Sequence, residues 1–146
     1  MMSRRKHLIL AADDNPTDRR ILQEAFRDVD GTVDVHFVED GAELLDYLRQ
    51  GGQHAATRAP SLVLLDLTMP RIDGKKALEA IKTDPRLRPI PVIVLTGSQE
   101  LSDICGVYDR GGATYVLKPG NFEDLVRIVG TVCEFWFRTA RLPELD

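Results

Sequence analysis

Charged and hydroxyl side chains follow several short apolar runs of this sequence. Three of them are carboxylates, and carboxylates at close range repel one another unless a counter-charge lies between them. A hard divalent cation that prefers oxygen ligands, above all Mg²⁺, is the natural counter-charge. Three carboxylates, one Mg²⁺ and one lysine balance to neutrality, which would admit a phosphoryl group. The residues are Asp13, Asp14, Asp66, Thr96 and Lys118.

These side chains meet only if the apolar runs are strands of one sheet. The runs are too short for helices and end at polar or turn residues, which is typical of buried strands. Helical periodicity fills the segments between them. The predicted strands are Leu8–Ala12, Val33–Val38, Leu62–Leu67, Val92–Leu95 and Thr114–Leu117. The predicted helices start at Asn15-Pro16 and then cover Ala42–Gln50, Lys75–Lys82, Ser98–Arg110 and Asn121–Arg138.

Strands that alternate with helices predict an α/β fold. Right-handed crossovers then give a doubly wound, five-stranded parallel sheet with five helices and the flavodoxin-like strand order 2-1-3-4-5. Ligands bind such sheets beyond the carboxyl ends of the strands. We therefore expect the polar residues that follow the strands to line one crevice.

The turn after the first strand narrows the class of ligand. A dinucleotide-binding or P-loop protein carries glycines there, whose backbone N–H groups hold phosphate. This sequence has the acidic, proline-containing stretch Asp13–Asp18 instead. Such a turn repels a free nucleotide and attracts a cation.

Length and composition set further bounds. The 146 residues predict a single domain over 1–146, with a core of about 7–138. A net charge of −4 argues against a nucleic-acid partner. No apolar run suits a membrane helix or a signal peptide, so we expect a cytoplasmic protein without membrane contact. Cys105 and Cys133 show no metal or disulfide pattern and are predicted to be buried.

Five motifs in order resemble the receiver domain of two-component response regulators. They extend over roughly Leu8 to Val132, and it is their order and spacing that make the resemblance specific. The motifs are Asp13-Asp14, Leu64–Pro70, Asp73-Gly74, Val94–Gly97, and Gly112-Ala113 leading into Tyr115–Pro119.

The resemblance implies a role for each residue of the expected crevice. Asp66 would be the phosphoacceptor, which attacks the phosphorus of a phosphohistidine and forms an acyl phosphate. Asp14 and Asp66 would ligate Mg²⁺, Asp13 would do so through water, and Thr68 would add its backbone carbonyl. Lys118 would pair with a phosphoryl oxygen and offset the charge that develops in the transition state.

The resemblance also implies a conformational switch. After phosphorylation the Thr96 hydroxyl would bind a phosphoryl oxygen, and Tyr115 would turn inward into the space left, so that a local charge change biases a two-state element. The less favoured alternative for Tyr115 is a half-buried aromatic residue of the strand without a switching role. The bond before Pro119 is expected to be cis, as in the family.

Three further stretches resemble the stand-alone regulators paired with bacterial phytochrome kinases. They imply a sensor histidine kinase as partner, with a bacteriophytochrome as the candidate. Because no output domain is recognisable after the last predicted helix, the signal is expected to leave through the surface of the domain. The stretches are Asp14–Asp18, Asp84–Val92 and Phe135–Phe137.

The last predicted helix carries more aromatic residues than its inner stripe can hold. Phe122, Phe135 and Phe137 cannot all share the stripe that covers the sheet, and exposed aromatic clusters mark interfaces. We expect a homodimer through Ser98–Arg110, Thr114–Leu117 and Asn121–Arg138. The alternative is a tail that folds back over its own domain.

Two other functions compete with a phosphorylation-dependent switch that is not an enzyme. A Mg²⁺-dependent phosphatase with an aspartyl nucleophile usually carries a second Asp two residues later, where this sequence has Thr68. A docking module that works without phosphorylation tends to lose the acidic pair or the phosphoacceptor, and this sequence keeps both. Both alternatives are therefore less favoured.

Overall fold

Strands and helices alternate along the chain in this computed structural model, which describes residues 7–29, 33–49, 59–69 and 71–143. Most of the predicted loop Gly51–Pro60 lies outside the described residues. The strands are β1 (His7–Ala12), β2 (Val33–Val38), β3 (Leu62–Leu65), β4 (Val92–Thr96) and β5 (Thr114–Leu117). The helices are α1 (Pro16–Phe26), α2 (Gly41–Leu48), α3 (Gly74–Thr83), α4 (Leu101–Asp109) and α5 (Phe122–Glu134), followed by a π-helical turn over Phe135–Thr139.

The strands form one parallel sheet in the order β2-β1-β3-β4-β5. The predicted fold class and strand order are therefore confirmed. Ala12, the last residue of β1, lies opposite Val38 on one side and Leu65 on the other. This register brings the carboxyl ends of β1 and β3 level, so the residues that follow them emerge side by side.

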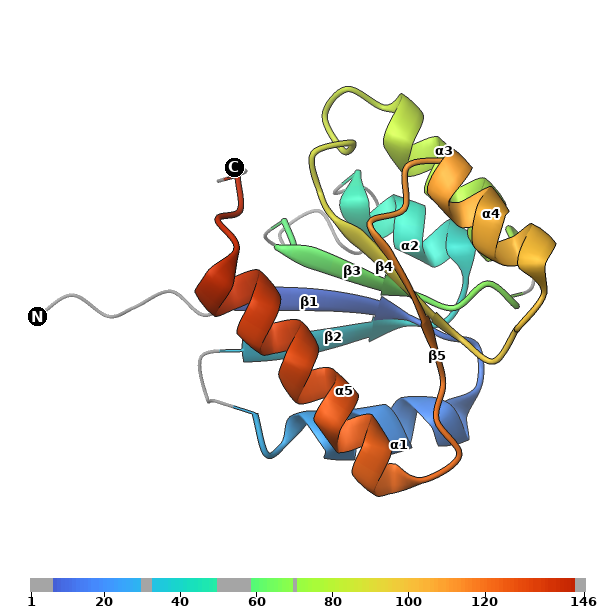
Figure 1. Ribbon diagram of the computed structural model, residues 1–146. Coiled ribbons are helices and arrows are strands. Elements are labelled where there is room, and N and C mark those ends of the chain that lie inside the picture. The colour runs from blue at the N-terminus through green and yellow to red at the C-terminus, as the bar shows by residue number, and fades with distance from the viewer. Residues whose placement is uncertain (1–6, 30–32, 50–58, 70, 144–146) are drawn as a thin grey trace, which may run out of the picture.

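Helices cover both faces of the sheet, with α1 and α5 on one face and α2, α3 and α4 on the other (Figure 1). Successive side chains of a strand point to opposite faces of the sheet and therefore pack in two separate apolar cores. Leu10 of β1 belongs to the core under α2, α3 and α4. Its neighbour Ile9 belongs to the core under α1 and α5. Both residues are fully buried, which explains why the inner strands read as continuous apolar runs.

Helix caps fix the loops at the carboxyl edge of the sheet. The Asn15 side chain accepts hydrogen bonds from the backbone N–H groups of Thr17 and Asp18, which starts α1 directly after the acidic pair. Asp73 caps α3 in the same way. Gly74 then lies so close to the preceding loop that an added Cβ would sit 2.5 Å from the Leu67 Cα and 2.6 Å from the Asp66 carbonyl oxygen.

Helix boundaries differ from the predictions near the carboxyl terminus. The helix predicted from Ser98 begins at Leu101, because the Ser98 hydroxyl bonds instead to Asp103 and to the backbone of Glu100. The helix predicted to reach Arg138 ends at Glu134 and continues as the π-helical turn.

Two smaller expectations were wrong. Cys105 is exposed while Cys133 is buried, because Val107 is the buried residue of α4 and Cys105 lies outside that narrow stripe. The peptide bond between Lys118 and Pro119 is trans, since the described part of the chain contains no cis peptide bond. Trans is the ordinary state of such a bond.

Candidate functional site

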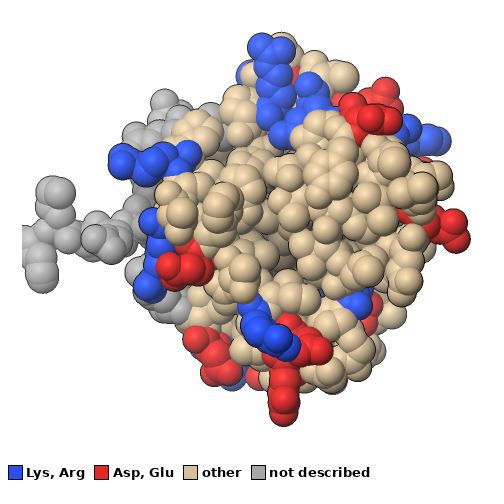
Figure 2. Space-filling view, in the orientation of Figure 1, with Lys and Arg blue, Asp and Glu red and all other residues tan. Residues whose placement is uncertain are grey.

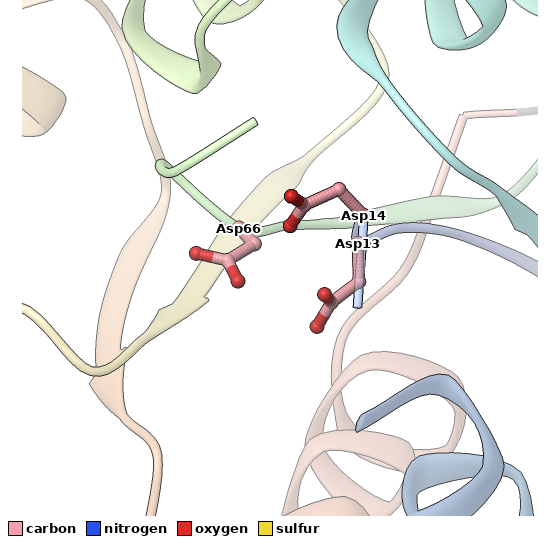
Figure 3. Close-up of side chains that lie close together, drawn as sticks. All are labelled: Asp13, Asp14 and Asp66. Carbon is pink, nitrogen blue, oxygen red and sulfur yellow. The ribbon is translucent and has the colours of Figure 1, made fainter. Parts of the chain in front are cut away.

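Three carboxylates meet at the carboxyl edge of the sheet (Figure 3). Asp13 and Asp14 follow β1, and Asp66 follows β3. One carboxylate oxygen from each lies within 4.8 Å of the others. Asp13 and Asp66 are only 4% and 8% exposed, whereas Asp14 lies in solvent. The register of β1 and β3 therefore produces a concentrated negative charge with one open side.

Lys118 supplies a cation to this cluster from the end of β5. Its Nζ donates to Asp13 Oδ2 and Asp66 Oδ2, both at 2.9 Å, and to Asp18 Oδ2 at 3.1 Å. Burial alone would lower the pKa of this ammonium, but the carboxylates of Asp66 and Asp13 together raise the pKa above its ordinary value. Lys118 therefore stays charged at neutral pH.

Hydrogen bonds hold both the side chain and the backbone carbonyl of Asp13 in place. Its Oδ1 accepts a hydrogen bond of 2.9 Å from the Asn15 N–H, and its carbonyl oxygen accepts one of 2.7 Å from Arg19. Burial nevertheless raises the pKa of Asp13 above its usual value, because Lys118 and the Asn15 N–H only partly offset the desolvation. A further cation would favour the ionised form.

Asp66 is bound on each of its two carboxylate oxygens. The Thr96 hydroxyl donates to Oδ1 at 2.9 Å, and the Thr68 backbone N–H donates to the same atom at 3.2 Å. Lys118 occupies Oδ2. Three residues, Thr68, Thr96 and Lys118, thus fix the orientation of this carboxylate.

Tyr115 connects β5 to the loop that follows Thr96. The half-buried ring packs against the core under α2, α3 and α4, and its hydroxyl donates to the Ser98 carbonyl at 2.8 Å. The Ser98 hydroxyl donates to Asp103 at 2.5 Å, and Asp103 pairs with Lys75 at 2.6 Å. The hydrogen bonds from Lys75 and Ser98 hold the pKa of Asp103 below its usual value.

The donor set fits a hard divalent cation. Asp13, Asp14 and Asp66 offer carboxylate oxygens close enough to share one ion, and oxygen ligands with room for water suit Mg²⁺. Asp14 is exposed, so this side of the cluster is open to solvent. The Thr68 carbonyl as a further ligand stays a prediction.

The structure gathers the residues predicted for the crevice, and their chemical roles stay predictions. Asp13, Asp66, Thr96 and Lys118 form one hydrogen-bonded cluster with Asp14 beside it. Tyr115 lies one step away, through Ser98. Sequence reasoning did not place Asp18 in this cluster. The position of Asp18 could have indicated this, because the first turn of a helix that starts directly after Asp14 lies at the carboxyl edge of the sheet.

A second feature is an apolar face over α4, β5 and α5, which we call the α4–β5–α5 face. Among the described residues, six large hydrophobic side chains are exposed, and all but Ile21 belong to these elements or to the turn after α5. The remaining five are Leu101, Tyr108, Leu117, Phe122 and Phe135. Figure 2 shows few charges over this part of the surface.

The end of the chain does not all join that face. Phe137 stacks on His7 with ring centroids 4.3 Å apart and packs, with Trp136, against the core under α1 and α5. Phe135 and Phe122 stay exposed. Trp136 and Phe137 therefore fold back onto the domain, whereas Phe135 faces solvent.

The fold and the site together define an α/β protein with a cluster of three carboxylates and a lysine at the carboxyl edge of its sheet. Residues 9–130 match the model of the response regulator receiver domain. The chain belongs to this family, which confirms the resemblance seen in the sequence. No described helix is long and apolar enough to cross a membrane.

Several relatives match over nearly their whole length. Response regulator Rcp1 of a Synechocystis strain is 34% identical over 93% of this chain and 92% of its own. A probable methanogenesis regulatory protein, FilR2 of Methanothrix harundinacea, is 38% identical over 93% of this chain and 87% of its own. A crystal structure of the phosphorylated cyanobacterial phytochrome response regulator RcpA superposes with a TM-score of 0.90 at 41% identity, covering 95% of this chain and 99% of that one.

A second crystal structure concerns the metal site. The Mn²⁺-bound form of response regulator Rcp1 superposes with a TM-score of 0.87 at 33% identity, and the match covers 94% of this chain and 99% of that one. That relative therefore binds a divalent cation on the same fold. Its match agrees with the donor set that Asp13, Asp14 and Asp66 present.

Proposed function

We propose that this protein is a response regulator that accepts a phosphoryl group from a histidine kinase on Asp66, in a Mg²⁺-dependent reaction. The observation that carries the proposal is the environment of Asp66. Its Oδ2 lies 2.9 Å from the Lys118 ammonium, and the Asp13 and Asp14 carboxylates stand beside it. A nucleophile, a cation and a metal-ligand set thus share one pocket.

The transfer balances as a displacement at phosphorus. A carboxylate oxygen of Asp66 attacks the phosphohistidine, an O–P bond forms, and the N–P bond breaks with its electron pair on the imidazole nitrogen, which takes up a proton. Lys118 donates to a phosphoryl oxygen, and the Thr96 hydroxyl orients the nucleophile. Mg²⁺, held by Asp13, Asp14, Asp66 and the Thr68 carbonyl, would neutralise negative charge on the phosphoryl group.

The partner follows from the relatives and from the sequence. RcpA is described as a phytochrome response regulator, and Asp84–Val92 and Phe135–Phe137 resemble regulators of that type. We therefore assign a histidine kinase of the phytochrome class as the phosphodonor. Because a histidine kinase uses ATP, we propose that this chain works in the cytoplasm, and we propose that it does so as a single receiver unit.

The test compares Asp66→Asn with the native chain in a phosphotransfer assay against candidate kinases. The asparagine variant is expected to lose labelling, because an amide is too weak a nucleophile to form the acyl phosphate. Asp28→Asn, at an exposed acid away from the pocket, is the matched control and should be labelled normally. Equal labelling of Asp66→Asn would refute the assignment of the acceptor.

We also infer that the α4–β5–α5 face binds a second copy of this chain. The exposed hydrophobic residues of this face are Leu101, Tyr108, Leu117, Phe122 and Phe135. An apolar patch with few charges suits a protein–protein interface. Sedimentation with and without a phosphoryl mimic tests the proposal. A dimer at tens of micromolar is expected, and a monomer under both conditions would contradict it.

Receiver domains are in general signalling modules, and we propose no turnover of external substrates. The residue two positions after Asp66 is Thr68, whose hydroxyl cannot serve as the acid of an aspartyl phosphatase. Incubation with a phosphomonoester and Mg²⁺ should release no phosphate beyond a single equivalent. Sustained release would favour the enzyme instead.

A further inference from the structure

Asp18 is a fourth carboxylate at the pocket, outside the group suited to hold the cation. It lies in the first turn of α1, where its backbone N–H donates to the Asn15 side chain at 3.0 Å. Its Oδ2 is 3.1 Å from the Lys118 ammonium. Its side chain is 42% exposed, against 6% for Asp13 and 10% for Asp66.

Lys118 has no N–H left for a phosphoryl oxygen in this arrangement. An ammonium carries three donors, and Asp13, Asp18 and Asp66 each accept one of them. An incoming phosphoryl group must therefore displace one carboxylate. Asp18 is the partner most open to water, so its carboxylate is the easiest of the three to resolvate.

The net charge of the pocket also indicates that Asp18 opposes the binding of a phosphoryl group. Asp13, Asp14, Asp18 and Asp66, with one lysine and one divalent cation, leave the loaded pocket with a net negative charge. Without Asp18 the same pocket is neutral. The phosphodonor is itself an anion, so Asp18 repels it through space and also competes with it for Lys118.

We propose that Asp18 is a positioning residue that restrains Lys118 and so slows phosphoryl transfer to Asp66. The proposal rests on the function proposed above. Because Asp18 is partly exposed, solvent and salt screen its effect. We expect Asp18→Asn to be phosphorylated about 3 to 10 times faster than the native chain, the size of one screened charge near the reacting group.

The experiment measures the labelling rate of the full chain by acetyl phosphate at saturating Mg²⁺. Asp18→Asn should be faster, and the gain should shrink with added salt. The gain should also be smaller with phosphoramidate, which is less negative than acetyl phosphate. Calorimetry should show weaker Mg²⁺ binding by Asp18→Asn, because one attractive charge is gone. A merely structural role would not speed one step while weakening the other.

Glu24→Gln is the matched control, since it removes one exposed carboxylate from the same helix, where Glu24 pairs with Arg27. It should behave like the native chain. Asp18→Ala is a second variant, which also removes the hydrogen bond to Lys118 and should be at least as fast. Melting temperatures show that each variant is folded.

The outcomes separate the two proposals. If the native chain is labelled neither by acetyl phosphate nor by the candidate kinases, the proposed function fails and this inference falls with it. If the native chain is labelled and both Asp18 variants are equal or slower, this inference alone is overturned. Faster labelling by the Asp18 variants but not by Glu24→Gln would support it.

Discussion

The pocket and the α4–β5–α5 face are opposite kinds of surface on one small fold. In the pocket, buried Asp13 and Asp66 sit about a hydrogen-bond length from Lys118. On the face, Leu117 and Phe135 are 42% and 50% exposed among few charges. One region concentrates charged side chains, and the other exposes apolar side chains to solvent. The pocket and the face lie on different parts of the fold, so the chemistry proposed for one and the contact proposed for the other can be altered separately.

Strand β5 belongs to both regions. Lys118 follows its last residue and enters the pocket, while Leu117 points to the face. Tyr115 in the same strand bonds the loop after Thr96, whose own hydroxyl bonds Asp66. Tyr115 itself is half-buried. A change at Asp66 therefore has a short path of contacts to the face.

The largest effect is expected from Lys118→Met, which removes the ammonium from the pocket. Phosphoryl transfer should slow by about 100-fold, as for loss of one preorganised donor to a developing charge. Labelling kinetics with acetyl phosphate measure this, and Lys76→Met, at an exposed lysine of α3, is the control. Transfer at near-native rate would show that Lys118 is only a structural counter-ion.

The next effect concerns the support of the pocket. Gly74→Ala should lower the free energy of unfolding by about 2 kcal/mol, because the new Cβ would meet the backbone of Asp66 and Leu67 at 2.6 and 2.5 Å. Gly130→Ala, within α5 and with no atom beyond its chain neighbours and its own helix backbone within 4 Å of the added Cβ, should instead stabilise the protein by about 0.5 to 1 kcal/mol. Urea denaturation distinguishes them, and equal changes would mean that the loop after Asp66 adapts freely.

The sequence predicts the pocket well because each pocket residue is placed by the strand next to it in the chain. Each polar residue follows an apolar strand, and a parallel sheet must place those ends on one edge. The convergence of residues from β1, β3, β4 and β5 follows from that rule, while the strand order is predicted from right-handed crossovers in a flavodoxin-like sheet. The helix start at Asn15-Pro16 follows from capping chemistry in the same way.

What the sequence does not predict depends on contacts between distant side chains. Ser98 delays the start of α4 because Asp103 and Glu100 bind its hydroxyl, and helical periodicity carries no sign of that. Asp18 joins the pocket through Lys118, 100 residues later. Phe137 turns back onto His7 while Phe135 does not, a division that no pattern along α5 distinguishes.

A smaller effect is expected on the apolar face. Leu117→Gln should weaken dimerisation about tenfold, since burying a leucine contributes roughly that much at an interface, while the labelling rate of Asp66 stays near native. Ile21→Gln is the control, because Ile21 is similarly exposed at 40% but lies on α1. Sedimentation equilibrium measures both. An equal loss for Ile21→Gln would place the dimer contact elsewhere.

The smallest effect is expected at Asp103, whose carboxylate binds Ser98 in the loop between Thr96 and α4. The hydrogen bonds from Lys75 and Ser98 lower its pKa below the ordinary value of 3.8. A lowered carboxyl pKa contributes stability above the unfolded-state value, and that stability is lost as pH falls through the folded-state value. Asp103→Asn should therefore be less stable by about 0.5 kcal/mol near neutral pH, with the gap closing below about pH 4.

Denaturation as a function of pH measures that gap. Asp109→Asn, at the exposed end of α4, serves as the comparison. A gap for Asp103→Asn that widens in acid would have the wrong sign. It would mean that the loop after Thr96 does not rely on the ionised carboxylate.

The central claim is that one pocket receives the phosphoryl group on Asp66, and direct mapping of the modified residue tests it best. The chain is incubated with acetyl phosphate and Mg²⁺, the acyl phosphate is reduced with borohydride, and the peptides are read by tandem mass spectrometry. Reduction at Asp66, absent when the cation is chelated, is the predicted result. Modification at another residue, or at Asp66 regardless of the cation, would contradict the account.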